Sequence, residues 1–172
     1  MIHFQKDSLD EIGKALKKYG KKYAILIDEG VDQLFGKEIR KVLKDKGIEA
    51  KYFTVPAGEK FKNLSTLEKL AEELVNNDIT RSETFVAIGG GMTTDLVGFL
   101  AATYMRGVPV IHIPTTILGM VDAAIGGKNG VNLSSGKNLI GTVHQPRAIL
   151  INPCFLKSIN ENQLRNSLAE II

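Results

Sequence analysis

The sequence predicts a Rossmann-like α/β fold, with a largely parallel sheet and helices on both of its faces. Short runs of β-branched and aromatic residues alternate along the chain with longer amphipathic stretches of helical periodicity. One buried run stops at three glycines and is followed directly by a helical stretch. Polar residues stand just after several of the expected strands, which is where ligands bind in parallel sheets.

The expected elements follow from periodicity and from helix start and stop signals. A first helix over 9–19 should begin with a capping box of Ser8 and Glu11 and end at Gly20. The further expected elements are a strand over 23–27, a helix over 31–43 closed by Gly47, a strand over 49–55 stopped by Pro56, a helix over 64–75, a strand over 85–88, a helix over 96–103, strands over 108–113 and 148–151, and a closing helix over 161–172.

The composition is typical of one globular domain over 1–172. Hydrophobic residues make up 44% of the chain, charged residues 24%, and the net charge is only +3. The lysines lie on predicted helix faces, so we expect no nucleic acid partner. The single cysteine, Cys154, excludes an intrachain disulfide and any multi-cysteine metal site. No signal peptide and no membrane-spanning run is present, so we expect a cytoplasmic protein without a membrane partner.

The three glycines Gly89–Gly91 form a turn between a buried strand and a helix N-terminus. Glycines allow a sharp turn and a close approach of a ligand, and the unpaired N–H groups of the helix suit a phosphate or pyrophosphate. The pattern is not G-x-G-x-x-G, because Thr94 occupies the place of the third glycine. A simple tight turn between a strand and a helix is the alternative interpretation.

A second polar segment combines Asp122, Lys128, Lys137 and Asn138 with many glycines. Apolar residues recur through it and should draw the segment inward. Buried or half-buried lysines need anionic partners, which a substrate phosphate or carboxylate, or Asp122, would supply.

These motifs together resemble the N-terminal domain of the 3-dehydroquinate synthases, over nearly the whole chain. The residues that carry the resemblance are Gly58-Glu59-Lys60-Phe61-Lys62, Gly89-Gly90-Gly91, Asp95, Arg106-Gly107, Pro114-Thr115-Thr116, Asp122, Gly126-Gly127-Lys128, Gly136-Lys137-Asn138, Gln145-Pro146 and Ala169-Glu170.

The resemblance implies a carbon–oxygen lyase of the shikimate pathway, which leads to chorismate and the aromatic amino acids. Such an enzyme binds NAD and a divalent metal, zinc or cobalt. It converts the sugar phosphate 3-deoxy-D-arabino-heptulosonate 7-phosphate into 3-dehydroquinate and phosphate, and we expect it to be a homodimer.

The resemblance also implies roles for individual residues. The adenosine end of NAD would be held by Asp28, Glu59 and Lys62, and its pyrophosphate by Gly89, Gly90, Gly91, Met92, Thr93, Thr94 and Asp95. The cofactor site would be completed by Thr115, Thr116, Phe155, Leu156, Lys157 and Ser158. The substrate and the nicotinamide would face Asp122, Lys128, Lys137 and Asn138, and Arg106 would reach the substrate phosphate across the dimer interface. Glu170 would be a metal ligand.

The sequence departs from the family pattern at Thr93-Thr94, Asn129 and His144, and the first of these departures touches the loop under the pyrophosphate. The chain ends at Ile172, so we interpret 161–172 as the start of a C-terminal helical domain that supplies the other metal ligands. His3, His112 and His144 do not have metal-ligand spacing, and His112 should be a packed core histidine. We therefore expect this chain alone to be inactive.

Three alternatives stay open at this point. They are a related sugar-phosphate cyclase, a metal-dependent glycerol or alcohol dehydrogenase, and a nucleotide-binding module without catalysis.

Overall fold

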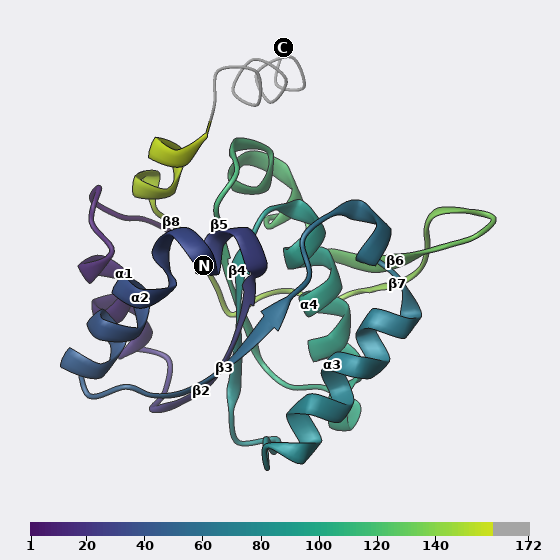
Figure 1. The fold of residues 1–172 in the computed structure, drawn as a ribbon, viewed down its shortest axis with the longest axis horizontal. Helices are drawn as coiled ribbons and strands as arrows, with labels where there is room; N and C mark the ends of the chain where they lie inside the picture. Colours follow the sequence, from purple (N-terminus) through teal and green to yellow (C-terminus); the bar gives the residue numbers. More distant parts are fainter. Residues whose placement is uncertain (160–172) are drawn as a thin grey trace.

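The computed structural model describes residues 1–159, which form a parallel sheet between two layers of helices (Figure 1). Helices α1 and α2 cover one face, and α3 and α4 cover the other. The strands are β1 (Ile2–Phe4), β2 (Lys22–Asp28), β3 (Glu49–Val55), β4 (Thr84–Gly89), β5 (Val110–Pro114), β6 (Lys128–Leu133), β7 (Gly136–Val143) and β8 (Ala148–Ile151). The α-helices are α1 (Asp10–Leu16), α2 (Glu29–Asp45), α3 (Leu64–Asn76) and α4 (Gly91–Thr103). Short 3-10 segments cover Glu59–Phe61, Tyr104–Arg106 and Pro153–Ser158, and a π-helical turn covers Gly119–Ala123.

The strand order places the candidate site at a reversal of the chain. Six strands lie in the order β1-β8-β5-β4-β2-β3, and all of their pairings are parallel. After β3 the chain returns to the other side of β2 to form β4, so the direction of winding changes between β2 and β4. Ligands bind beyond the carboxyl ends of the strands at such a point. Asp28 ends β2 and Gly89 ends β4, so both stand at this position.

Burial on both faces explains why the central strands are continuous apolar runs. Every residue of β4 is buried, with Val86 and Ile88 in the core under α1 and α2, and Phe85 and Ala87 in the core under α3 and α4. The predicted α/β class is therefore confirmed. The predicted ends of two strands, 49–55 and 148–151, are also confirmed.

Two details of the first part of the chain differ from the prediction. The capping box is wrong, because α1 begins at Asp10 and the Ser8 hydroxyl accepts from the Asp10 N–H at 3.3 Å rather than from that of Glu11. Strand β1 was not predicted, since it has only three residues and its neighbours are polar. The closing helix expected over 161–172 lies outside the described residues. Within residues 1–159, no helix has the length and apolar character needed to cross a membrane.

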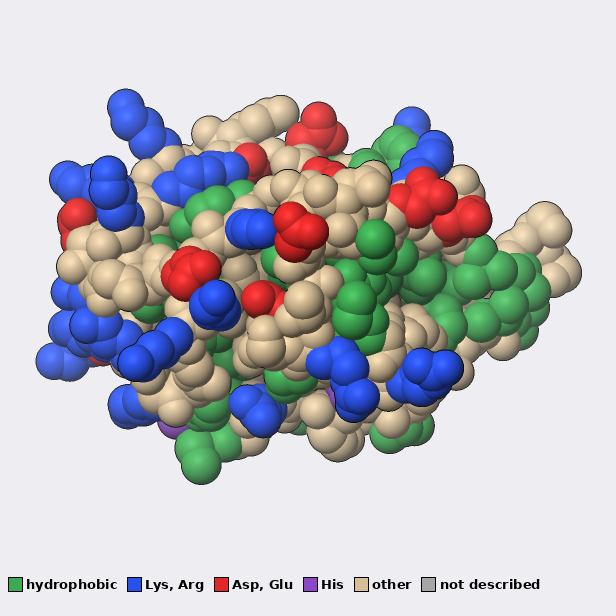
Figure 2. Space-filling model, turned by 90° about the horizontal axis from the view of Figure 1, so that it is seen from below, with side chains coloured by type: hydrophobic (Ala, Val, Ile, Leu, Met, Phe, Trp, Pro, Cys, Tyr) green, Lys and Arg blue, Asp and Glu red, His purple; other side chains and the backbone are tan. Residues whose placement is uncertain are grey.

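The glycine-rich segment after the π-helical turn forms an antiparallel hairpin, β6–β7, which packs through β6 against α4. This hairpin was not predicted. Val131 is buried, but Leu139 and Val143 are 60% and 73% exposed, so the expectation that apolar residues draw the segment inward holds for only part of it. Figure 2 shows hydrophobic side chains gathered on the surface toward the hairpin end of the molecule.

Substituting Gly141 by alanine should lower the free energy of unfolding by about 1–3 kcal/mol, the usual cost of overpacking. A Cβ at Gly141 would lie 2.2 Å from the Asn129 carbonyl oxygen and 2.9 Å from the Gly130 Cα, and backbone atoms cannot move away cheaply. Gly126→Ala is the matched control, because a Cβ there meets nothing within 4 Å. Urea unfolding of both variants checks the expectation, and equal losses would contradict it.

Candidate functional site

A single residue, Gly90, makes the turn from β4 to α4 at the centre of the site. Gly90 caps the helix without any side-chain hydrogen bond, so no side chain occupies the N–H groups of the first turn. These N–H groups and the positive end of the helix dipole are suited to binding an anion. The phosphate cradle at this helix end stays a prediction.

Close packing, rather than backbone freedom, favours glycine at positions 89 and 90. None of Gly89, Gly90 and Gly91 has a positive φ, so the sharp turn does not need glycine at these positions. A Cβ on Gly89 would lie 2.6 Å from the Thr93 side chain, and a Cβ on Gly90 would lie 3.1 Å from Thr116. The backbone is therefore packed closely against two threonines, and any added side chain would displace them.

Thr93 and Thr94 depart from the family pattern, but both of their hydroxyls are satisfied inside the chain. The Thr94 hydroxyl donates to the Gly91 carbonyl at 3.0 Å, and the Thr93 hydroxyl donates to Asp28 at 3.4 Å. Both side chains are buried, and the Thr94 N–H donates to the Gly90 carbonyl at 3.0 Å, so what these two residues leave for a ligand is the Thr93 N–H. Asn129, another departure, is buried and donates to the carbonyls of Gly127 and His144, which closes the base of the hairpin.

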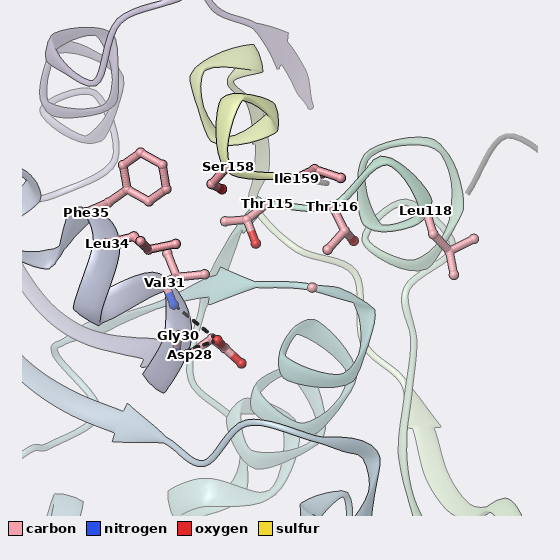
Figure 3. Close-up of a pocket in the computed structure, with 11 residues that line it drawn as sticks. Asp28, Gly30, Val31, Leu34, Phe35, Thr115, Thr116, Leu118, Ser158 and Ile159 are labelled. Carbon is pink, nitrogen blue, oxygen red and sulfur yellow. Dashed lines mark hydrogen bonds between the residues drawn. The ribbon is translucent and has the colours of Figure 1, made fainter. Parts of the chain in front are cut away.

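A cavity of about 500 Å³ opens on one side of the glycine turn (Figure 3). The start of α2 contributes an apolar wall of Val31, Leu34 and Phe35. Hydroxyl-bearing residues lie across from this wall at the end of β5 and after β8, namely Thr115, Thr116 and Ser158. Apolar walls with a few polar groups that fix the orientation of a ligand are typical of small-molecule and cofactor sites.

Asp28 lies at the floor of this first cavity. One of its carboxylate oxygens caps α2 by accepting from the N–H groups of Gly30 at 2.9 Å and Val31 at 3.2 Å. The other oxygen accepts only the long bond from Thr93 among the described residues. Asp28 thus has a fixed orientation and one oxygen with capacity for a ligand hydroxyl.

A buried ion pair lies on the other side of the glycine turn, just past the first turn of α4. Lys62 is 4% exposed, and its ammonium is 2.5 Å from Asp95 and 2.6 Å from the Asn138 side-chain oxygen. Burial raises the pKa of Asp95, and the hydrogen bond from Lys62 opposes that shift. Three distant segments meet here: the turn after β3, the helix α4 and the strand β7.

A second cavity, of about 540 Å³, opens beside this ion pair. It is lined by Glu59, Lys60, Lys62 and Asn63 from the turn after β3 and by Asn132, Leu133, Ser134, Ser135, Gly136 and Lys137 from the hairpin. Asp28 and the pair Glu59 and Lys62 therefore line different cavities. The structure does not bring these three residues together as one group.

The two lysines predicted to be buried or half-buried, Lys128 and Lys137, are exposed, and this prediction is wrong. Asp122 on the π-helical turn is exposed as well. The reason is the hairpin, whose two-stranded ladder satisfies the backbone at the surface and leaves both lysine side chains in solvent. They present positive charge rather than filling a buried site.

The segment after β8 contributes less to the cavity than predicted. Of Phe155, Leu156, Lys157 and Ser158, only Ser158 lines it. Phe155 is buried in edge-to-face contact with Phe35, with ring centroids 5.2 Å apart, and Lys157 pairs with Asp7 at 2.7 Å. Phe155 thus supports the apolar wall from behind.

Arg106 is exposed in a turn at the far end of α4. Met105, Arg106 and Gly107 have φ values of 48°, 69° and 115°, and left-handed backbone is uncommon for the first two residue types. Helix α4 separates Arg106 from the glycine turn by about 20 Å, given 1.5 Å of rise per residue. The chain therefore does not bring its own Arg106 to the cradle.

The described residues contain no group of three or more histidine, cysteine, aspartate or glutamate side chains placed to bind a metal. His3 bonds to the Tyr19 hydroxyl at 2.5 Å, His144 lies 3.2 Å from the Val108 carbonyl, and His112 is buried in β5 as predicted. The predicted ligand Glu170 lies outside residues 1–159.

Sequence reasoning missed several residues that shape the site. The apolar wall of the first cavity and its rim at Leu118 and Ile159 carry no motif. Asn132 was also missed, although it contacts Glu59, Lys62 and Asn138. Its position between the two lysine motifs was the only available signal, and contact across a hairpin cannot be read from spacing.

Comparisons with known proteins agree with this architecture. The model of the 3-dehydroquinate synthase N-terminal domain matches residues 52–166. The 3-dehydroquinate synthase of Nostoc sp. (strain PCC 7120) is 45% identical over 167 residues, which cover 96% of this chain and 46% of that protein. The chain therefore spans about half the length of the curated relatives it matches.

Two solved structures extend the comparison. ValA, a 2-epi-5-epi-valiolone synthase from Streptomyces hygroscopicus solved with NAD+ and Zn2+ bound, is 35% identical with a TM-score of 0.92, over 99% of this chain and 48% of ValA. An iron-containing alcohol dehydrogenase is 16% identical with a TM-score of 0.79, over 97% of this chain and 49% of that one, and this likeness shows the fold alone. Family model, relatives and fold agree, and the chain belongs to the 3-dehydroquinate synthase family.

Proposed function

We propose that this chain is the NAD-binding half of a 3-dehydroquinate synthase, which converts 3-deoxy-D-arabino-heptulosonate 7-phosphate into 3-dehydroquinate and phosphate. The observation that carries the proposal is the position of the α4 N-terminus. It has no side-chain cap and stands between an apolar, hydroxyl-lined cavity and a buried lysine–aspartate pair. A dinucleotide has a nucleoside, a pyrophosphate and a second nucleoside, in the same order as the cavity, the helix N-terminus and the ion pair.

The residues present fit NAD. The adenosine would lie in the first cavity, with its base on the Val31–Phe35 wall and its ribose near Asp28. The pyrophosphate would meet the N–H groups of Gly91 and Met92 at the start of α4. The nicotinamide end would then point toward Asp95 and Lys62. This path moves Lys62 and Glu59 from the adenosine end, where the family resemblance had placed them, to the other end of the cofactor.

The chemistry that NAD would supply when bound is to take up a hydride from the carbon that bears a substrate hydroxyl and later to return it. The chain's own residues contribute polar atoms with fixed positions and positive charge near the substrate. Asp95 and Asn138 are held around the Lys62 ammonium, so their remaining polar atoms have fixed directions. Exposed Lys128 and Lys137 offer positive charge to an anionic sugar phosphate approaching over the hairpin.

The described residues do not fit a metal, so no step is assigned to one here. A zinc or cobalt ion remains part of the proposal only because the family resemblance makes Glu170 a metal ligand. Homodimerisation also remains a proposal. It is supported by the distance of Arg106 from its own chain's cradle and by the exposed apolar residues of the hairpin.

Calorimetric titration with NAD tests the proposal, and a graded series at Gly90 tests the cradle. We expect the chain to bind NAD, Gly90→Ala to bind more weakly, and Gly90→Val to raise Kd on the order of tenfold or more, since each added methyl displaces Thr116 and blocks the backbone. Thermal melts establish that each variant is folded. No heat from millimolar NAD on folded chain would overturn the proposed function, and equal Kd values across the series would overturn the cradle.

A further inference from the structure

The β6–β7 hairpin is irregular at one point, opposite Asn132. Val131 pairs with Ile140 and Leu133 pairs with Gly136, so the single residue Asn132 faces the three residues 137–139 of β7. Extra residues in one strand bend it and redirect its side chains, and such bulges often occur next to functional sites. Here the bulged segment contains Lys137 and Asn138.

Asn132 bonds to three separate parts of the site. Its side-chain oxygen accepts from the Asn138 N–H at 2.9 Å, and its side-chain nitrogen donates to Glu59 at 2.8 Å. Its backbone N–H donates to the Lys62 carbonyl at 2.8 Å. Two of these bonds reach the turn after β3, at Glu59 and at the Lys62 carbonyl, and the third holds Asn138 within the hairpin.

The Lys62 ammonium is linked to Asn132 through Asn138. Asn138 has a φ of 55°, a left-handed conformation that asparagine tolerates but that needs local support. The bond from its N–H to Asn132 supplies that support, and the Asn138 side chain then accepts from Lys62 at 2.6 Å. Asn132 therefore holds Lys62 at both ends, at its carbonyl directly and at its ammonium through Asn138.

We propose that Asn132 is a positioning residue of the cofactor site, acting through Asn138 and Lys62. This inference rests on the proposed function, since it assigns the Lys62–Asp95 pair to the nicotinamide end of NAD. Asn132 itself touches no reacting group. Its bonds to Glu59 and Asn138 lie at the surface, where hydrogen bonds add little to the stability of the fold.

A reciprocal exchange of charge tests the role. In Asn132→Asp, two carboxylates face each other and the bond to Glu59 is lost. In the double variant Asn132→Asp with Glu59→Gln, the amide introduced at position 59 donates to the carboxylate introduced at position 132, which still accepts from the Asn138 N–H. Asn77→Ala is the control, because Asn77 is an exposed asparagine whose side chain bonds only to a carbonyl of its own helix.

Two measurements on the purified chain are needed: amide hydrogen exchange at Asn138 without ligand, and the Kd for NAD. Asn132→Ala and Asn132→Asp should raise Kd on the order of tenfold, the size of a coupled pair of contacts. Asn132→Ala should also speed Asn138 exchange. The double variant should show the protected Asn138 exchange of wild type and bring Kd back to that of Glu59→Gln alone, and Asn77→Ala should change neither quantity.

The possible failures are distinguishable. A chain that binds no NAD overturns the proposed function, while the exchange measurement still decides whether Asn132 positions Asn138. Unchanged exchange in Asn132→Ala overturns the positioning role even if NAD binds. An unchanged Kd in that variant, or no rescue in the double variant, overturns the link between Asn132 and the cofactor.

Discussion

Replacing Lys62 by methionine should lower the free energy of unfolding by about 3 kcal/mol, the low end of the cost of breaking a buried ion pair. Methionine preserves most of the length of the side chain but removes the charge. The Lys62 side chain is 5% exposed and that of Asp95 is 20% exposed, so the aspartate would be left largely buried without its cation. The partial exposure of Asp95 is the reason for choosing the low end of the range.

The loss should depend on pH in a defined direction. Burial already raises the pKa of Asp95, and Lys62 opposes that shift, so removing Lys62 raises this pKa further. When the pKa of an acid is higher in the folded state than in the unfolded state, the folded chain binds more protons. The free energy of unfolding therefore falls as pH rises. The difference between wild type and Lys62→Met should therefore grow from acidic to neutral pH.

Two further variants control this experiment. Lys60→Met removes an exposed lysine two residues away and should have little effect. Lys62→Met combined with Asp95→Leu removes both charges and should recover most of the loss. Denaturant unfolding at several pH values measures each variant, and a loss below about 1 kcal/mol for Lys62→Met would place the pair among weak surface ion pairs.

The sequence predicts those parts of the fold that depend on neighbouring residues in the chain. The apolar runs of β3 and β8 and the stripes of α2 and α3 follow from periodicity, and both helices cover the sheet as their apolar faces require. The hairpin could not be read in this way. Gly130 and Gly141 pair across it, and glycines carry no pattern. Its existence depends on packing against α4, which is a tertiary contact.

The candidate site likewise has one part that could be predicted from the sequence and one part that could not. Asp28, the glycine turn and Thr115 follow strand ends, so parallel topology alone predicts that they lie on one rim. Lys62 and Asp95 are separated by 33 residues and meet only because the turn after β3 folds back over the start of α4. The exposure of Lys137 likewise depends on the irregular register of β7, which no periodicity indicates.

His112 should make the stability of the chain fall in acid. Its side chain is 1% exposed in the middle of β5, and neither ring nitrogen has a hydrogen-bond partner among the described residues. Burial lowers the pKa of His112 from 6.5 to about 4, with the backbone at Ala124 opposing the shift and the charge of His144 adding to it. The ring is therefore neutral in the folded chain at physiological pH.

The sign of the effect follows from proton binding in the two states. Above pH 6.5 the ring is neutral whether the chain is folded or unfolded, so His112 contributes no pH dependence there. Between pH 6.5 and about pH 4 the unfolded chain binds the proton and the folded chain does not, so the free energy of unfolding falls as pH falls. A difference of roughly 2.5 pKa units, at 1.36 kcal/mol each, predicts a total loss of about 3 kcal/mol.

His112→Leu isolates this contribution, because carboxylates also titrate in the same range and are common to both proteins. At pH 7 the variant should be at least as stable as wild type, since it removes two buried nitrogens that lack hydrogen-bond partners. Its advantage should widen by about 3 kcal/mol as the pH is lowered toward the folded-state pKa. Urea unfolding of both proteins across this range tests the expectation, and parallel curves for wild type and His112→Leu would show that the buried ring does not control acid stability.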